Sequence, residues 1–390
     1  MAIVKGRKVI ADLKNVFEAT KERISFMFDN YDNISVSISG GKDSTVLFHL
    51  INDEAIKRDR KFICYFLDQE AEYAGTVEWM EWAMNQPNVI PYWYQVPIYM
   101  TNAVSQEQLY LFAWGDGEEW VRDKHPLAIQ RIKGNYPKRF YKFNYWHESN
   151  LAKLPGTTIS VIGLRAQESP DRWFAVTGGE VDAGLYWLRK NIRRTSIDLS
   201  FPLADWKHED VWKYLIDNKK KYNKVYDLMY MHGYKLHQMR VSNLIHEKAF
   251  HSLGDLQELE PETYERLCRR LKGVHCAGIY ANEPMVYSIR KLPSAFKSWK
   301  DYRVHLLSNI HPELKRIFDY QFARFYNAEV EKGGKLDDYY ERYMVKRILL
   351  GDWEGNMLDN KEPMNYTKDQ LAERRILRKE DEIIKRWLSI

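Results

Sequence analysis

The sequence predicts an α/β protein with a parallel, twisted sheet flanked by helices and a helical C-terminal region. Three observations favour this fold. Over roughly the first 255 residues, short runs of β-branched and aromatic residues alternate with segments of helical periodicity. Glycine-bearing or polar loops follow several of these runs. Beyond about residue 256 the pattern is helical and charged, without a recognisable strand. Such alternation is typical of parallel sheets, whose strands are connected by helices.

The expected strands share β-branched and aromatic residues; they are residues 34–38, 62–67, about 89–96, 158–162 and a short strand around 197–199. The expected helices place apolar residues at three- and four-residue spacing; they are residues 8–29, a helix starting with 44–51, 72–84, and one starting at 205 or 207. Ligands of such sheets bind beyond the carboxyl ends of the strands. We therefore expect the loops at 39–44, at Asp68 and at 163–172 to meet at one edge.

Two domains are expected. Residues 1–255 form the sheet domain, and residues 256–390 form the helical C-terminal region. Residues 99–157 interrupt the first domain as an insertion rich in aromatic residues. We expect this insertion to form a lid or a wall of the substrate site.

Composition favours a cytoplasmic protein without a membrane segment. No stretch approaches the 18 or so apolar residues of a membrane span, and the N-terminus lacks the apolar region of a secretory signal. Three cysteines cannot form a disulfide framework and fit a reducing compartment. The net charge of +5 permits nucleic acid as a partner without demanding it, and a small phosphate-rich ligand fits equally well.

The most informative segment is a glycine-bearing loop between an expected strand and an expected helix; it consists of Ser39, Gly40, Gly41, Lys42, Asp43 and Ser44. Glycines let the backbone approach an anion closely and permit positive φ. The N–H groups and the dipole at a helix start favour phosphate. The Walker spacing is absent. Asp43 could orient a metal ion or hold the loop's own amides. A tight turn that merely caps a helix is the alternative.

The hexapeptide is similar to the SGGxDS loop of the adenine nucleotide α-hydrolase superfamily, the PP-loop ATP pyrophosphatases. Within it, the chain most resembles the phosphoadenosine-phosphosulfate reductase family. A second motif is the strand that ends at Asp68, and a third is Gly-x-Arg-x-x-Glu-Ser-x-x-Arg at residues 163–172. A fourth comprises residues 202–206, 210–215 and 222–227, with the family's Pro-Leu-x-x-Trp, Asp-Val-Trp and Tyr-Asn patterns. Together the motifs cover about residues 34–230.

The resemblance implies that the chain binds ATP or a related sulfonucleotide together with Mg²⁺ and cleaves the nucleotide at its α-phosphate. The residues implied as catalytic are Lys42, Asp43, Arg165 and Arg172. Those implied to hold the nucleotide, besides the loop itself, are Asp68, Gly163, Glu168 and Ser169. An arginine fork suits phosphate oxygens, Glu168 could orient one of the arginines, and the backbone at Gly163 could face an adenine. For each arginine, a surface ion pair is the alternative.

One departure from the family argues against sulfonucleotide reduction. The reductases carry a Glu-Cys-Gly-x-His motif near the C-terminus, and this chain has none. Cys276 is the nearest equivalent, whereas Cys64 and Cys268 are interpreted as small buried residues. A metal site formed by His246, His251, His275 and Cys276 has no standard zinc-finger spacing.

Segments outside the core motifs resemble a reductase-like branch known as IbrA-like, a co-activator type found beside a ParB-like partner; these segments are residues 14–20, 239–243 and 259–264. Two functions therefore stay open. One is an ATP pyrophosphatase that adenylates an unknown acceptor or takes part in sulfur transfer with an outside sulfur source. The other is a nucleotide-sensing regulatory subunit that acts with a ParB-like, DNA-associated partner. Direct DNA modification rests on analogy of fold alone.

Overall fold

The computed structural model describes residues 2–4, 7–9, 15–105, 110–177, 185–190, 197–246, 250–280, 292–331 and 338–349. The chain divides into two compact units. Unit 1 comprises residues 1–100, 112–244 and 257–266, and unit 2 comprises residues 101–111, 245–256 and 267–390. The domain boundary expected at residue 255 stays a prediction.

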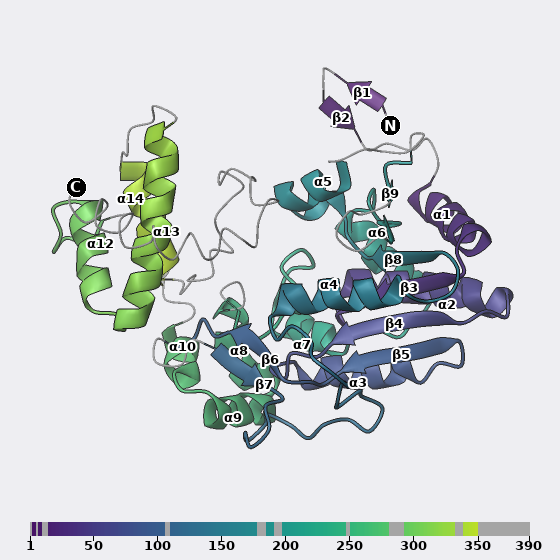
Figure 1. Ribbon diagram of the computed structural model, residues 1–390, viewed down its shortest axis with the longest axis horizontal. Helices are drawn as coiled ribbons and strands as arrows, with labels where there is room; N and C mark the ends of the chain where they lie inside the picture. Colours follow the sequence, from purple (N-terminus) through teal and green to yellow (C-terminus); the bar gives the residue numbers. More distant parts are fainter. Residues whose placement is uncertain are drawn as a thin grey trace. The chain divides into compact units, whose positions relative to one another are not determined.

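Unit 1 contains a six-stranded sheet with the strand order β5-β4-β3-β8-β10-β9 (Figure 1). Its strands are β3 (Asn33–Ser37), β4 (Phe62–Leu67), β5 (Val89–Tyr94), β8 (Thr158–Ile162), β9 (Leu188–Arg189) and β10 (Asp198–Ser200). All neighbouring pairs are parallel except β9 with β10. The predicted parallel sheet is therefore confirmed, and β9 is an antiparallel edge strand that the sequence did not suggest.

The centre of the sheet is β3, which lies between β4 and β8. Val36 is in register with Cys64 on one side and with Val161 on the other. All three are fully buried, as expected for parallel strands covered on both faces. This register brings the carboxyl ends of β3, β4 and β8 together. The loops that follow these strands therefore start at one edge of the sheet, as predicted.

The helices of unit 1 include those predicted from periodicity. Their bounds are α1 (Val16–Asn30), α2 (Lys42–Lys57), α3 (Ala74–Met84), α4 (Phe140–Leu151), α5 (Pro170–Thr177), α6 (His208–Asp217) and α7 (Val225–Met231), with a short 3₁₀ turn at Ala166–Glu168. Helices α2 and α3 pack side by side through the edge-to-face rings of Phe48 and Trp79. Helix α4, from the aromatic-rich insertion, lies over the sheet (Figure 1).

The expected helix at 8–29 begins too early. Arg7–Val9 is strand β2, which pairs with β1 (Ala2–Val4) as an antiparallel hairpin. Helix α1 starts only at Val16, because the side chain of Asn15 accepts the N–H of Phe17 at 2.9 Å and caps the helix. The apolar periodicity continues upstream of this cap and gave no sign of it.

The remaining elements include a short hairpin and the C-terminal helices. They are β6 (Ile98–Thr101), β7 (Tyr110–Ala113), α8 (Phe250–Leu259), α9 (Pro261–Arg270), α10 (Val274–Tyr280), α12 (Trp299–Ser308), α13 (Pro312–Glu331) and α14 (Asp338–Leu349). In unit 2, helices α12, α13 and α14 share an apolar core that includes Leu307, Phe318, Phe322, Met344 and Ile348. The predicted helical C-terminal region is thus confirmed.

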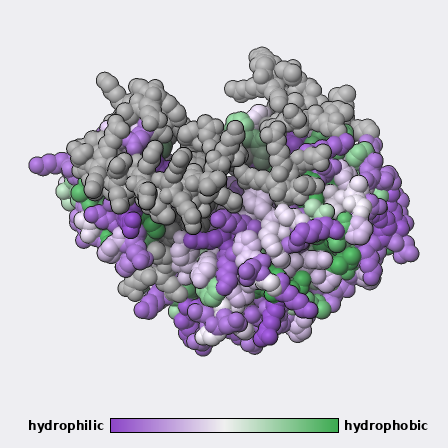
Figure 2. Space-filling view, viewed as in Figure 1, coloured by the Kyte–Doolittle hydropathy of each residue, from purple (hydrophilic) through white to green (hydrophobic). Residues whose placement is uncertain are grey.

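The described surface is largely polar. On the face shown in Figure 2, hydrophilic residues cover most of the described area and hydrophobic residues lie in small groups. None of the described helices is long and apolar enough to cross a membrane.

Candidate functional site

The loop between β3 and α2 is a glycine turn at the start of a helix. Gly40 has φ of +68°, and a Cβ at this position would lie 2.7 Å from Thr76 Cγ2, so only glycine fits. In the part of the chain that the structure describes, no protein acceptor is hydrogen-bonded to the backbone N–H of Gly40, Gly41, Asp43 or Ser44. The first N–H groups of a helix lack intrahelical partners. Here they remain available to an anion at the positive end of the α2 dipole.

Side chains from distant segments fix this loop. Asn223, which is fully buried, donates its Nδ2 to the Gly40 carbonyl at 3.2 Å and to Thr76 Oγ1 at 2.8 Å. Tyr226 Oη accepts the N–H of Lys42 at 2.8 Å. Within the loop, Ser44 Oγ accepts the Ser39 N–H at 3.2 Å and lies 3.3 Å from Ser39 Oγ. The loop is thus held in shape before any ligand arrives.

Lys42 is less exposed than its motif suggests. Its ammonium donates to the Met239 carbonyl at 3.1 Å, and its side chain is buried. Burial lowers the pKa of Lys42, Asp43 opposes that shift, and Arg165 and Arg240 add to it through their positive charge. Arg240 is therefore a further cation near the loop. Burial also raises the pKa of the Tyr226 hydroxyl, which keeps it protonated.

Asp43 binds an arginine from the third motif. Its Oδ1 lies 2.5 Å from Arg165 Nε and its Oδ2 3.4 Å from Arg165 NH2. The Arg165 side chain is only 4% exposed. Gly163 allows this approach, because a Cβ there would lie 3.2 Å from the backbone of Asp43 and Ser44. The structure thus gives Gly163 a packing role at the start of α2, and it joins the first and third motifs through Asp43 and Arg165.

The side chain of Arg172 pairs with Glu168 and not with Asp43. Arg172 lies in α5, its side chain is 44% exposed, and its NH1 pairs with Glu168 Oε2 at 2.8 Å. Ser169 Oγ accepts the backbone N–H of Arg172 at 3.2 Å. Glu168 therefore pairs with the exposed arginine of the motif, and a role of Glu168 in nucleotide binding stays a prediction. The structure brings Arg165 to the loop and leaves Arg172 in a surface ion pair.

Asp68 is fully buried in a network of protein donors. Trp93 Nε1 and Gln95 Nε2 donate to its Oδ2 at 2.8 and 2.9 Å. Arg122 NH2 and the Glu70 N–H donate to its Oδ1 at 2.6 and 3.0 Å. Its carboxylate thus anchors the aromatic-rich insertion to the end of β4. The predicted nucleotide contact by Asp68 stays a prediction.

Asp43 is engaged by Arg165, and Asp68 accepts from four donors. The expected Mg²⁺ stays a prediction, and we derive no step through it. Over the described ranges, no group of three or more His, Cys, Asp and Glu residues could hold a metal ion. His246, His275 and Cys276 therefore belong to no such group.

The cysteines are free. Cys64 is buried in β4, as predicted, and burial raises the pKa of its thiol well above the ordinary value. Cys268 in α9 is half-buried, and Cys276 in α10 is exposed.

A buried acid beside Asp68 predicts an unusual pH dependence of stability. Burial, and then the charge of Asp68, raise the pKa of Glu72 to about 8. Between the unfolded pKa near 4.5 and the folded pKa of about 8, the folded state holds a proton that the unfolded state has lost, so stability falls as pH rises.

We expect the free energy of unfolding of Glu72→Gln to match that of wild type near pH 4.5 and to exceed it at pH 8 by about 2–4 kcal/mol. Urea unfolding across this range measures the difference. The exposed Glu119→Gln variant is the control, and a pH-independent difference for Glu72→Gln would contradict the assignment.

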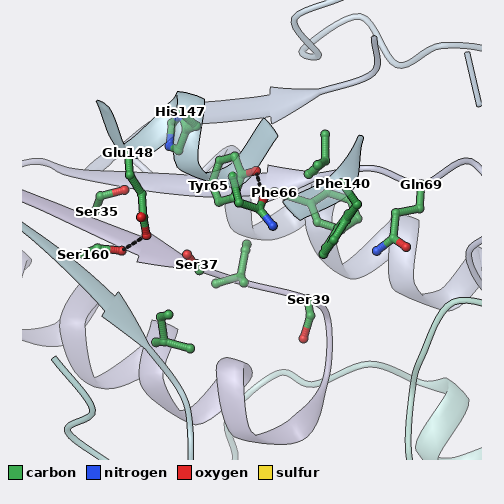
Figure 3. Close-up of a pocket in the computed structure, with 14 residues that line it drawn as sticks. Ser35, Ser37, Ser39, Tyr65, Phe66, Gln69, Phe140, His147, Glu148 and Ser160 are labelled. Carbon is green, nitrogen blue, oxygen red and sulfur yellow. Dashed lines mark hydrogen bonds between the residues drawn. The ribbon is translucent and has the colours of Figure 1, made fainter. Parts of the chain in front are cut away.

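A pocket of about 240 Å³ adjoins the loop. It lies between α4 and the face of the sheet formed by β3, β4 and β8 (Figure 3). Its lining residues are Ser35, Ser37, Ile38, Ser39, Tyr65, Phe66, Leu67, Gln69, Phe140, Asn144, His147, Glu148, Ser160 and Ile162. Ser39 belongs both to the loop and to the pocket. Helix α4 of the insertion contributes one wall of this pocket, and its role as a wall of a substrate site stays a prediction.

Several residues of the site were not assigned roles from the sequence. Asn223 and Tyr226 lie within the fourth motif, so the signal was present without a function attached to it. His147 and Glu148 lie in the insertion, where only the aromatic residues stood out. Arg240 lies in a segment that resembles the IbrA-like branch, and the sequence does not indicate its proximity to Lys42.

A parallel α/β sheet with a glycine loop between its central strand and the next helix is typical of nucleotide-binding domains. Residues 33–261 match the phosphoadenosine phosphosulfate reductase domain, and the chain belongs to this family. Residues 233–381 match a second family model, a domain of unknown function (DUF3440). The IbrA-like branch stays a prediction.

Individual proteins that are similar to this chain share 26% of its sequence or less. The uncharacterized protein YbdN of Escherichia coli (strain K12) is 26% identical over 345 residues, which are 82% of this chain and 81% of the relative. The phosphoadenylyl-sulfate reductase of Candida auris, in a phosphate complex, has a TM-score of 0.32 at 12% identity and covers 59% of this chain and 96% of its own. The FMN adenylyltransferase of Candida glabrata, in complex with FMN and the ATP analogue AMPCPP, has a TM-score of 0.33 at 16% identity, covering 56% of this chain and 63% of its own.

Proposed function

We propose that the chain binds an adenine nucleotide with its phosphates on the loop at residues 39–44 and its base in the adjoining pocket. The observation that carries this proposal is the set of backbone N–H groups at Gly40, Gly41, Asp43 and Ser44 that have no protein acceptor in the described chain. They lie at a helix start, next to a pocket that shares Ser39 with the loop. Membership of the phosphoadenosine phosphosulfate reductase domain family supports an adenine nucleotide as the ligand.

The proposed reaction is in-line attack on the α-phosphorus of ATP. An oxygen or nitrogen of an acceptor forms the new bond to the α-phosphorus, the bond to the bridging oxygen of the β-phosphate breaks, and pyrophosphate leaves with that electron pair. The loop amides stabilise the developing negative charge without having to reorganise. Arg165, fixed by Asp43, and Lys42 add positive charge at the same end of α2. With water as the nucleophile, the product is AMP.

Reduction of a sulfonucleotide is not proposed. The chain lacks the Glu-Cys-Gly-x-His motif, and Cys64 is buried in the sheet with a raised thiol pKa. A thiolate is the reactive form of cysteine, so Cys64 is unsuited as a nucleophile. Sulfur transfer to the adenylated acceptor would require a separate sulfur donor.

A regulatory subunit is the second candidate, and a specific observation favours it. The charged side chains of the loop are tied to protein groups: Lys42 to the Met239 carbonyl and Asp43 to Arg165. With Lys42 and Asp43 occupied by protein groups, the nucleotide is held mainly by the loop amides, which is sufficient for a sensor that does not turn it over. In this function the bound nucleotide controls a ParB-like, DNA-associated partner, as the resemblance to the IbrA-like branch suggests.

Calorimetry with ATP and an assay of pyrophosphate release test both candidates on the intact chain. We expect ATP to bind in the micromolar range, corresponding to about 8 kcal/mol of binding free energy, and pyrophosphate to accumulate over many turnovers. Binding without release of pyrophosphate would support the regulatory subunit and contradict the enzyme. Absence of binding by ATP, AMP and a sulfonucleotide would contradict both.

A further inference from the structure

The pocket has a polar inner end. Ser35 on β3 and Ser160 on β8 lie on the sheet face beneath α4, and both are buried. Figure 3 shows them at the same end of the pocket as His147 and Glu148, whereas Ser39 and Gln69 lie at the other end. A sheet face beneath a helix is ordinarily filled by apolar side chains. We call Ser35, His147, Glu148 and Ser160 the inner polar end.

His147 has an unsatisfied ring nitrogen there. It is 2% exposed, its ring stacks on Tyr65 at 4.0 Å between centroids, and its Nδ1 lies 3.3 Å from Tyr94 Oη. Its Nε2 is buried and has no hydrogen-bond partner among the described residues. Burial lowers the pKa of His147 to about 3, so the ring is neutral near pH 7. Native structures seldom leave such an atom unpaired, and a polar group of a ligand would satisfy it.

Glu148 places a carboxyl group beside it. Ser160 Oγ donates to Glu148 Oε1 at 3.4 Å, which leaves Oε2 and further lone pairs for a ligand. Burial raises the pKa of Glu148, and the bond from Ser160 opposes that shift. Through Oε2 the carboxyl group can accept a hydrogen bond from a donor of the ligand. Beside it, Nε2 of His147 is available to the neighbouring ligand atom.

The length of the pocket suggests which part of a ligand reaches this end. Ser35 and Ser39 are four residues apart on one extended segment, a span of about 13 Å at the usual rise of a strand. A nucleoside phosphate whose phosphate lies on the loop amides extends over a comparable length. Its base, and not its ribose, therefore reaches the inner polar end.

We propose that His147 and Glu148 select adenine: the carboxyl group of Glu148 accepts a hydrogen bond from the 6-amino group, and Nε2 of His147, as the N–H tautomer, donates one to N1. This inference rests on the proposed nucleotide site and adds its base specificity. The 6-amino group is a donor next to the N1 acceptor, and enzymes commonly read bases along this edge. Hypoxanthine reverses the pattern, with an acceptor at position 6 and a donor at N1. Purine without a 6-substituent keeps N1 and loses the amino donor.

Competition calorimetry with ATP, ITP and purine riboside triphosphate tests the proposal on the full chain. We expect wild type to bind ATP about 10- to 100-fold more tightly than ITP, which is the difference that one or two buried hydrogen bonds make. The variant His147→Phe keeps the ring stacked on Tyr65 and removes its nitrogens, and Glu148→Met removes the carboxyl group at similar length. Both should bring the ATP-to-ITP ratio close to one by weakening ATP.

Ser149→Ala is the matched control, because Ser149 is the next residue of α4 and does not line the pocket. It should keep the wild-type ratio, and melting curves verify that each variant is folded. An undiminished preference for ATP in both pocket variants, or no preference in wild type, would overturn the assignment of His147 and Glu148 while leaving the nucleotide site intact. If none of the three triphosphates binds, the proposed function itself is wrong.

Discussion

Replacing Gly41 with valine is expected to abolish nucleotide binding, with a loss of affinity of at least about 100-fold, while the protein stays folded. Gly41 precedes α2 with φ of −76° and ψ of 153°, a conformation that valine favours. A Cβ there would meet Ser39 Oγ only at 3.3 Å and Tyr226 Oη at 3.7 Å. The added methyl groups would instead keep a phosphate away from the loop amides.

Calorimetry with ATP and thermal melting measure this effect. Gly134→Ala is the control, since Gly134 has φ of +87° and no atom within 4 Å of an added Cβ. That variant carries backbone strain of about 1–2 kcal/mol and should bind ATP as wild type does. Wild-type affinity in folded Gly41→Val would show that the loop does not hold the phosphates.

The second large effect is expected from Arg165→Lys. Lysine keeps the charge but cannot make the two-point contact that the guanidinium makes with Asp43. The pair is largely buried, with 4% and 15% of the two side chains exposed. Weakening such a pair should cost about 2–4 kcal/mol of stability. Because Asp43 lies in the first turn of α2, the loop should shift and ATP affinity fall by about 10- to 100-fold.

Arg172→Lys is the matched comparison, with the same substitution in the same motif. The exposed pair with Glu168 is expected to contribute under about 1 kcal/mol, and ATP affinity should stay within about threefold of wild type. Urea unfolding and calorimetry on both variants measure the contrast. Equal losses in the two variants would place Arg172 on the nucleotide, as the sequence motif implied. Wild-type behaviour of both would remove the third motif from the site.

The sheet and the loop could be predicted from the sequence because their signals are local. Strand β4 follows from a run of apolar and aromatic residues and β8 from a run rich in β-branched residues, and the loop at 39–44 follows from two glycines between a strand and a helix. Helix α1 shows the limit of this approach. Its periodicity was visible from residue 8, whereas its start depends on one side-chain hydrogen bond from Asn15.

The contacts within the site could not be predicted, because they join residues that are far apart in the chain. Asp68 follows a strand, as a ligand-binding carboxylate would, but its donors come from Trp93, Gln95 and Arg122. Arg165 and Arg172 are equivalent in the motif, and the short turn between them directs only Arg165 toward α2. His147 became a candidate because the structure shows an unpaired nitrogen, a property that has no signature in sequence.

A crystal structure of the protein grown with AMP tests the central claim most directly. We expect the phosphate to accept hydrogen bonds from the amides of Gly40, Gly41, Asp43 and Ser44, and the base to occupy the pocket beneath α4. An AMP molecule bound elsewhere, or a phosphate that makes no contact with these amides, would contradict the nucleotide site proposed for this chain.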